Sequence, residues 1–305
     1  MTLEQKAPLC AGLFLYYGRK IMLHVRAHSC AYIFFGLLFV AIFLWGALFA
    51  FGGEGSREVV MYFLDIGQGD AIFIETPDHV QMLIDGGPNK KILSELGSIM
   101  PFTDRTIDVV LLSHPHEDHV GGLIDVLDRY DVRTVVAAET PYDSGAFREW
   151  DEKVDAEGAE HVRALRGMRI WLASDVWFDV LAPASFIQEE PANIHDAMIV
   201  GKLVYGNTCV IFTGDMERDI ERSLLGDDIG CEVLKVGHHG SKTSTSDAFL
   251  KAVSPSVAVI SAGRNNRYGH PHDVILNKLE KAGIRILRTD IDSTVILRSN
   301  GENVF

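Results

Sequence analysis

Three histidines and two acids stand within six consecutive positions directly after an apolar run. The segment reads SHPHEDHVGG from Ser113 to Gly122, and the run before it, Ile107 to Leu112, has the length of a buried strand. A helical pattern follows from about His119 to Tyr130, and the Gly-Gly pair lets that helix pack closely beneath a site. Functional side chains of α/β proteins collect at the carboxyl ends of strands. The segment therefore predicts either a metal site or a polar turn that is merely rich in histidine.

The spacing within this segment favours two metal ions. His114 and His116 are two residues apart in an extended loop, so they can point the same way and hold one ion. Asp118 and His119 lie beyond the bend and can reach a second ion. Two ions about 3.5–4 Å apart can activate a water molecule and neutralise an oxyanion together. We interpret the cluster as a binuclear site, in which Asp118 orients the attacking water and shuttles its proton.

Two later strand ends can complete the set of ligands. The apolar run from Val210 ends in Gly-Asp, which places Asp215 where it can bridge both ions. Asp215 can also cap the helix expected after it, and the two roles are compatible. A second apolar run, Val233 to Val236, ends in a pair of histidines at 238 and 239.

Strand-length apolar runs and helical patterns alternate through residues 59–305, twice over. This rhythm predicts one α+β domain with two sheets packed together and covered by helices. The predicted strands are 59–66, 71–75, 81–84, 107–112, 133–137, 169–172, 176–181, 197–205, 208–213, 232–236, 257–261 and 284–288. The predicted helices are 119–130, 218–225, 247–253 and 272–282.

An uncharged apolar run precedes this domain, from Ala31 to Phe51. As a helix it would be about 30 Å long, enough to cross a bilayer once. Basic residues outnumber acids in residues 1–30, which predicts a cytoplasmic N-terminal segment and an extracytoplasmic domain anchored in the cell membrane. The alternative is a cleaved signal peptide, although the run is long and its small-residue site is poor. Residues 52–58 are expected to form a flexible linker.

Charge and cysteine content limit the possible partners. The formal net charge is -14, and Glu4 is the one acid that precedes the apolar run. Such an acidic domain does not attract nucleic acid over its whole surface, so a nucleic-acid substrate needs a local basic patch or the metal ions themselves. The four cysteines do not suggest a disulfide framework, and we expect Cys209 and Cys231 to be buried thiols.

Taken together, the motifs resemble a known family. His-x-His-x-Asp-His followed by Gly-Gly, at 114–122, is typical of the metallo-β-lactamase superfamily of binuclear metallohydrolases. Four further motifs resemble the C-terminal hydrolase domain of the ComEC/Rec2 competence proteins, in the expected order between about Val59 and Arg298. They are FLDIGQGDA at 63–71, LIDGG at 83–87, KVGHHGSKTS at 235–244 and NRYGHP at 266–271.

The resemblance implies a four-layer αββα sandwich and a set of ligands. It places His114 and His116 at one ion and Asp118 and His119 at the other, with Asp215 as the bridge, His238 as the later ligand, and His239 and His270 facing the same cleft. His195 falls near the family's variable third-ligand position, and it is either a ligand of the first ion or a solvent-facing loop histidine. Imidazole and carboxylate ligands without cysteine suit two Zn²⁺ ions, with Mn²⁺ as the alternative.

Further polar residues are candidates for holding a ligand in place. Asp65, Gln68 and Asp70 belong to a predicted hairpin turn whose tip can approach the site, and Gln68 or Asp70 can hydrogen-bond a metal ligand. Turn chemistry alone also explains these residues. Asp85 ends a buried strand and is expected to act as a carboxylate partner of a ligand.

Three functions fit these observations. The first is a membrane-anchored phosphodiesterase or nuclease, with single-stranded DNA as the candidate substrate. Lys235 and Ser241 beside the histidine pair suit a phosphate, unless they are merely solvated, and the cluster Arg264 to Tyr268 offers an aromatic ring beside cations. The second is hydrolysis of an ester, thioester or lactam, which a narrow apolar pocket would favour.

The third function is a non-catalytic binding domain, against which the full ligand set argues. The competence proteins carry many membrane helices, whereas one apolar span precedes the domain here. We therefore expect that this chain does not import DNA by itself.

Overall fold

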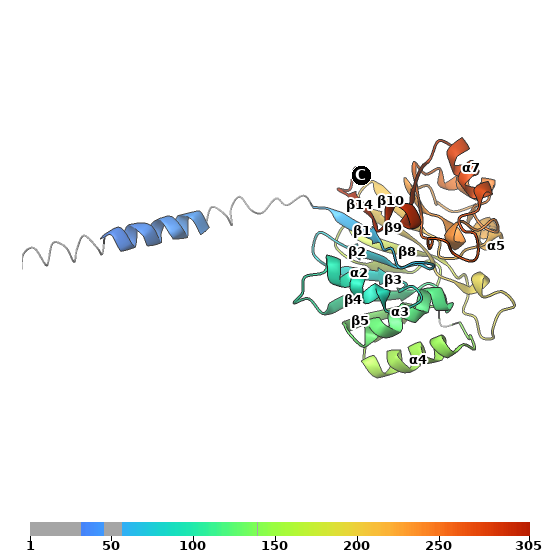
Figure 1. Cartoon of the computed structure of the whole chain (residues 1–305), viewed down its shortest axis with the longest axis horizontal. Coiled ribbons are helices and arrows are strands. Elements are labelled where there is room, and N and C mark those ends of the chain that lie inside the picture. Colours follow the sequence, from blue (N-terminus) through green and yellow to red (C-terminus); the bar gives the residue numbers. More distant parts are fainter. Residues whose placement is uncertain (1–31, 46–56, 139) are drawn as a thin grey trace, which may run out of the picture. The chain divides into compact units, whose positions relative to one another are not determined.

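The structure is a computed structural model that describes residues 32–45, 57–138 and 140–305 (Figure 1). The chain divides into two compact units, Met1–Ser56 and Arg57–Phe305. In the first unit, residues 32–45 form a helix whose side chains are exposed. Among the described residues, no helix combines the length and the apolar character needed to cross a bilayer. Residues 1–31 and 46–56, which include the ends of the predicted span, lie outside the described residues.

The second unit contains two mixed sheets with the same plan. In the described residues the first sheet has seven strands in the order β14-β1-β2-β3-β4-β5-β6. Strands β14, β1, β2 and β3 pair antiparallel, and β3, β4, β5 and β6 pair parallel. The bounds are β1 (Val59–Phe63), β2 (Ile72–Glu75), β3 (Gln81–Ile84), β4 (Thr106–Leu112), β5 (Asp131–Ala137), β6 (Glu160–Arg163) and β14 (Val295–Ser299).

The second sheet follows the order β13-β12-β11-β10-β9-β8-β7. Strands β7 to β10 pair antiparallel, and β10 to β13 pair parallel. The bounds are β7 (Arg169–Trp171), β8 (Val176–Ala182), β9 (Val200–Tyr205), β10 (Thr208–Phe212), β11 (Val233–Lys235), β12 (Val257–Ile260) and β13 (Arg285–Arg288). Because parallel strands end at the same edge of a sheet, each sheet presents several strand ends side by side.

Three apolar clusters separate four layers, which confirms the predicted αββα sandwich. Between the sheets, the rings of Phe63 and Phe178 each lie 6.1 Å from that of Phe212. A second cluster joins the first sheet to α2 (Lys91–Ile99), α3 (Glu117–Leu127) and α4 (Gly145–Glu157), which lie along its outer face in Figure 1. A third joins the second sheet to α5 (Arg218–Leu224), α6 (Asp247–Val253) and α7 (Asp273–Lys281).

Burial differs between the outer and the central strands of the first sheet. In β1 the residues Val59, Met61 and Phe63 point into the layer between the sheets, whereas every residue of the central strand β3 is buried. A strand that is covered on both faces reads as a continuous apolar run. The glycine pair of α3 packs as predicted, because a Cβ at Gly122 would lie 2.0 Å from the carbonyl oxygen of Gly86.

Several elements were not predicted from the sequence. They are α2, α4, β6, the short helix α8 (Thr289–Asp292) and the edge strand β14. The predicted strand 197–205 begins only at Val200, because a 3-10 turn, η1 (Ile194–Ala197), occupies the residues before it. Strands β1 and β2 do pair antiparallel, but residues 64–71 form a longer loop between them rather than a tight hairpin turn.

The expectation of free thiols at Cys209 and Cys231 is wrong. These residues form a disulfide that joins β10 to the segment leading into β11, with Cα atoms 5.2 Å apart. Cys209 lies within an apolar run and Cys231 follows a glycine, and neither setting distinguishes a thiol from a disulfide. The pairing depends on the parallel neighbours β10 and β11, which sequence spacing does not reveal.

Candidate metal centre

The carboxyl ends of four strands bring polar side chains to one cleft and its immediate surroundings. Strand β3 leads to Asp85, β4 leads to the histidine segment at 114–119, β10 leads to Asp215, and β11 leads to the histidine pair at 238 and 239. The first two strands belong to one sheet and the last two to the other. The cleft therefore lies where the edges of both sheets meet, and it has a volume of about 160 Å³.

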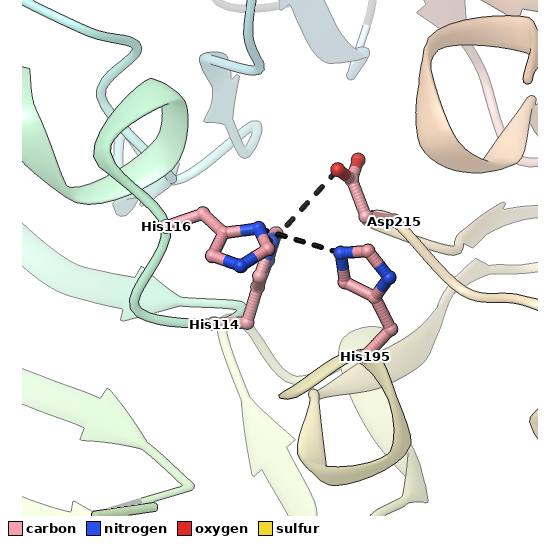
Figure 2. Close-up of side chains that lie close together, drawn as sticks. All are labelled: His114, His116, His195 and Asp215. Carbon is pink, nitrogen blue, oxygen red and sulfur yellow. Dashed lines mark hydrogen bonds and ion pairs between the residues drawn. The ribbon is translucent and has the colours of Figure 1, made fainter. Parts of the chain in front are cut away.

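A first group of four donors comes from both halves of the fold (Figure 2). His114, His116, His195 and Asp215 each offer one atom, and these atoms lie within 4.8 Å of one another. His116 Nδ1 lies 3.1 Å from His114 Nε2 and 3.3 Å from His195 Nε2. His195, for which the sequence left two interpretations open, thus points toward the other imidazoles from η1.

A second group contains Asp118, His119 and His239. The Nε2 atoms of His119 and His239 each lie 3.3 Å from Asp215 Oδ1, and His239 Nε2 lies 3.4 Å from Asp118 Oδ2. The other oxygen of Asp215, Oδ2, lies 3.9 Å from His114 Nε2 in the first group. Asp215 therefore faces both groups, one oxygen to each, as a bridging carboxylate must.

The structure brings His239 to the second group, whereas the resemblance had assigned the later ligand to His238. His239 is buried, and its Nδ1 donates to the carbonyl oxygen of Ser261 at 3.0 Å, which leaves Nε2 directed at Asp118 and Asp215. The side chain of His238 is 21% exposed, and its Nδ1 lies 3.4 Å from Glu217 Oε1. Both histidines have positive φ, 50° and 54°, so the backbone turns sharply here.

Asp85 contacts His119 directly and His114 through Ser113. Its Oδ2 accepts hydrogen bonds from His119 Nδ1 at 2.8 Å and from Ser113 Oγ at 2.6 Å, and its Oδ1 accepts from the backbone N–H of Ser113 at 2.7 Å. Ser113 Oγ in turn lies 3.0 Å from His114 Nδ1. This network places protons on the Nδ1 atoms, so the Nε2 atoms are the ones that would bind a metal ion.

Asp70 and Lys235 form a buried ion pair beside the second group. Asp70 Oδ1 also lies 3.5 Å from His239 Nδ1, and Lys235 Nζ donates to the carbonyl oxygen of Gly214 at 3.2 Å. The loop carrying Asp70 approaches closely because residue 69 is glycine: a Cβ there would lie 2.1 Å from the carbonyl oxygen of Asp118. The Lys235 ammonium is thus engaged inside the protein rather than presented to a substrate.

The remaining predicted residues divide between the cleft and its surroundings. Gln68 and His270 line the cleft. Ser241 is buried and hydrogen-bonds Thr243 Oγ1 at 3.0 Å, and Asp65 pairs with Lys91 at 3.2 Å.

Sequence reasoning missed Ser113 and Glu217. Glu217 Oε1 lies 3.7 Å from His195 Nδ1 and 3.4 Å from His238 Nδ1. The signals were present, since Ser113 stands between the end of β4 and His114, and Glu217 follows Asp215 by two residues.

The cleft favours neutral imidazoles in the first group and carboxylate anions in the second. Burial, together with the neighbouring His119, lowers the pKa of His114 well below its ordinary value, and burial lowers the pKa of His195 to about 4. Burial acts to raise the pKa of Asp215, but His239 and His119 lower it well below the usual range. Neutral imidazole and ionised carboxylate are the forms that bind divalent cations.

Unpaired buried atoms show that the donor set suits metal ions. Among the described residues, Asp215 Oδ1, His119 Nε2 and His239 Nε2 are buried without a hydrogen-bond partner, and these are the atoms that face one another. A buried polar atom without a partner is costly, so such atoms call for a ligand. Imidazole nitrogens and carboxylate oxygens together fit Zn²⁺ or Mn²⁺.

Comparison with known proteins places the fold in a family. The model of the metallo-β-lactamase superfamily matches residues 64–264. The chain is 34% identical to ComE operon protein 3 of Bacillus subtilis over 80% of this chain and 33% of that protein. It is 30% identical to the competence protein ComA of Neisseria gonorrhoeae over 79% of this chain and 32% of that protein. The chain thus spans about a third of the length of these curated relatives, and the matches confirm the resemblance to the ComEC/Rec2 proteins.

A solved structure agrees on the fold. The metallo-β-lactamase fold protein YhfI from Bacillus subtilis superposes with a TM-score of 0.52, at 10% identity, over 78% of this chain and 98% of that chain. At this identity the structural match supports the fold alone. The family model and the two donor groups support metal-dependent hydrolysis. The chain belongs to the metallo-β-lactamase superfamily and is a metal-dependent hydrolase.

Proposed function

We propose that this chain is a membrane-anchored phosphodiesterase that cleaves nucleic acid, with single-stranded DNA as the substrate. The observation that carries the proposal is the pair of donor groups sharing Asp215 beneath a cleft with polar and aromatic walls. In the described part of the chain the residues lining this cleft are Gln68, His116, Asp118, His195, Asp215, His238, His239, Tyr268 and His270. Such walls suit a charged polymer better than an aliphatic ester or a lactam, which would favour an apolar pocket.

The names of the relatives support a DNA substrate. ComE operon protein 3 and ComA are similar over most of this chain, and ComA is named a competence protein. A third relative, from Haemophilus influenzae, is named recombination protein 2 and is 29% identical over 76% of this chain. Because the chain matches about a third of each relative or less, the proposal concerns hydrolysis and not transport.

We assign the ligands as follows. One ion would be held by His114, His116, His195 and Asp215, and the other by Asp118, His119, His239 and Asp215. Divalent ions at these positions supply Lewis acidity toward a phosphoryl oxygen and toward water. In this assignment His239 takes the position that the resemblance had given to His238.

The other side chains of the cleft position water and substrate. Burial acts to raise the pKa of Asp118, but the neighbouring His239 and His119 lower it, so Asp118 stays ionised and can accept a proton from the attacking water. His238 lies at the edge of the first group, held by Glu217 and by Thr243 Oγ1 at 3.3 Å. Its exposed ring is placed to hydrogen-bond a phosphoryl oxygen.

The location of the enzyme is part of the proposal. Lys and Arg before residue 31 favour a cytoplasmic N-terminus, and a span at 31–51 would then place the hydrolase unit outside the cytoplasm. The disulfide between Cys209 and Cys231 supports this side of the membrane, because disulfides persist in oxidising compartments.

The test uses the purified full chain, loaded with Zn²⁺ or with Mn²⁺. We expect hydrolysis of single-stranded DNA and of bis-p-nitrophenyl phosphate, and loss of both activities in Asp118→Ala and His116→Ala with the fold retained by circular dichroism. Strong cleavage of a β-lactam or a thioester without diesterase activity would refute the proposal in favour of the small-molecule hydrolase. If the chain is fully loaded with metal but hydrolyses none of these substrates, the remaining interpretation is a non-catalytic binding domain.

A further inference from the structure

One wall of the cleft is formed by an aromatic side chain that is largely open to solvent. Tyr268 lines the same cleft as the metal donors Asp118 and His239, and 49% of its surface is exposed. Its ring lies 5.7 Å from that of His270 with an angle of 22° between the planes, so His270 supports it from the protein side. An exposed ring offers a flat apolar face on which a flat ligand can stack, which makes it a candidate contact for such a ligand.

A cation accompanies this ring. The guanidinium carbon of Arg267 lies 4.8 Å from the ring centre, and Arg267 Nη2 donates to the Tyr268 hydroxyl at 2.6 Å. An exposed cation–π contact is weaker than the stacking of a base on an aromatic ring. A nucleobase can therefore displace the guanidinium, which remains close enough to neutralise a phosphate.

The loop that carries the ring is shaped by the side chain of Asn266. Its Nδ2 donates to the carbonyl oxygens of Gly263 and His270, at 2.9 and 2.5 Å, and its Oδ1 accepts from the backbone N–H groups of Tyr268 and His270, at 3.1 and 3.0 Å. Both donors and both acceptor positions of the amide are in use. One side chain thus fixes the loop on both sides of Tyr268, so the ring is presented in a prepared position.

A second observation points to a ligand at the same wall. Gln68 also lines the cleft, and its Oε1 accepts from the backbone N–H of Gly263 at 3.2 Å. Because that N–H requires an oxygen, the other end of the amide is Nε2, and this buried nitrogen has no hydrogen-bond partner. An unpaired amide donor beside a metal centre fits an oxygen of a bound phosphate.

We propose that Tyr268 and Gln68 form a nucleotide subsite beside the metal centre. In it, a nucleobase stacks on the Tyr268 ring, and Gln68 Nε2 donates to the phosphate of the same nucleotide. The subsite deepens the proposed function and rests on it, since it takes the substrate to be a nucleic acid. The subsite is not expected to distinguish one nucleobase from another, because every base has a flat face that can stack.

Three chromogenic diesters with the same leaving group test the subsite on the Zn²⁺-loaded full chain. They are the p-nitrophenyl esters of thymidine 5′-phosphate, of thymidine 3′-phosphate and of methyl phosphate. We expect Tyr268→Ala to lower kcat/KM for one of the thymidine esters by roughly 5- to 150-fold, while the methyl ester changes less than twofold. Tyr268→Phe keeps the ring and should stay within twofold of the wild type.

The matched control is Trp171→Ala. Trp171 is also exposed, at 59%, and also carries an arginine, Arg169, over its ring at 5.4 Å, but it belongs to the edge strand β7 and not to the cleft. Trp171→Ala should keep kcat/KM for all three esters within twofold of the wild type. Gln68→Leu removes the donor to phosphate and should lower kcat/KM for the thymidine and methyl esters alike.

The outcomes separate the subsite from the proposed function. If Tyr268→Ala leaves the thymidine esters unchanged, or lowers the methyl ester equally, the subsite is refuted while the phosphodiesterase stands. If the wild type cleaves no diester, the phosphodiesterase is refuted, and binding of a hydrolysis-resistant phosphorothioate oligothymidylate, followed by fluorescence anisotropy, decides the subsite. Weaker binding of the oligonucleotide by Tyr268→Ala than by the wild type supports the subsite. Equal binding by Tyr268→Ala and the wild type overturns it.

Discussion

Replacement of Asp85 by asparagine should weaken the second metal site without touching a ligand. Asp85 accepts three hydrogen bonds, from the backbone N–H of Ser113, from Ser113 Oγ and from His119 Nδ1. Asparagine keeps the shape but has one oxygen and one NH2 group, so it cannot accept at both ends. The backbone N–H of Ser113 can only donate, so the single oxygen of the asparagine side chain is expected to accept from it.

The NH2 group of the introduced asparagine would then face His119 Nδ1. Two donors cannot share a hydrogen bond, so we expect His119 to move its proton from Nδ1 to Nε2, where it blocks the lone pair that faces Asp215. Loss of a partner that orients a ligand costs about 10–100-fold in metal affinity. This corresponds to about 1.4–2.7 kcal/mol of binding free energy, at about 1.36 kcal/mol for each factor of ten.

The assay is titration of the metal-free full chain with Zn²⁺ against a chromophoric chelator. We expect two ions per chain in the wild type, and one tight and one weakened ion in Asp85→Asn. Asp65→Asn is the matched control, because Asp65 pairs with Lys91 at 3.2 Å and accepts from the backbone N–H of Gly67. Two ions bound with wild-type affinity by folded Asp85→Asn would refute the role given to this carboxylate.

Three further predictions concern the ligands, the buried ion pair and the disulfide. His239→Ala should bind one Zn²⁺ ion per chain, whereas His238→Ala should bind two ions and lose activity. Elemental analysis of the bound zinc distinguishes the two variants. The reverse pattern would show that His238 is the ligand. Lys235→Met leaves a buried carboxylate uncompensated and should lower the free energy of unfolding of the metal-free protein by about 3–5 kcal/mol in urea; a loss below about 1 kcal/mol contradicts this. Cys209→Ser opens a loop with a sequence separation of 22 residues and should cost about 3 kcal/mol under oxidising conditions; an unchanged urea midpoint would show that the bridge does not form.

The sequence predicted the parts of the site that follow directly from strand ends. Asp85, His114 and Asp215 each come after a buried apolar run, and parallel strands that end at one edge bring such residues together. The same reasoning predicted the two covered sheets. What it omitted were elements whose residues do not show a clear period, such as the exposed edge strand β6, Glu160–Arg163.

Long-range pairing explains the other omissions. Strand β14 completes the first sheet by pairing with β1, from which it is separated by most of the chain. The Cys209–Cys231 bridge likewise depends on β10 and β11 being neighbours. Local patterns of hydropathy carry no information on which strand lies next to which, so these features become visible only when the sheets are assembled.

The choice between His238 and His239 shows where sequence reasoning reaches its limit at the site itself. Two adjacent histidines after one strand are equally able to bind metal, and in a regular extended chain their side chains would point in opposite directions. Both residues instead adopt left-handed backbone angles, and the carbonyl oxygen of Ser261, from the end of β12, accepts from His239 Nδ1. The orientation of His239 is therefore set by a neighbouring strand that lies more than 20 residues further along the chain. A carbonyl oxygen has no sequence signature, so a motif alone can place the pair at the site but cannot assign the role within it.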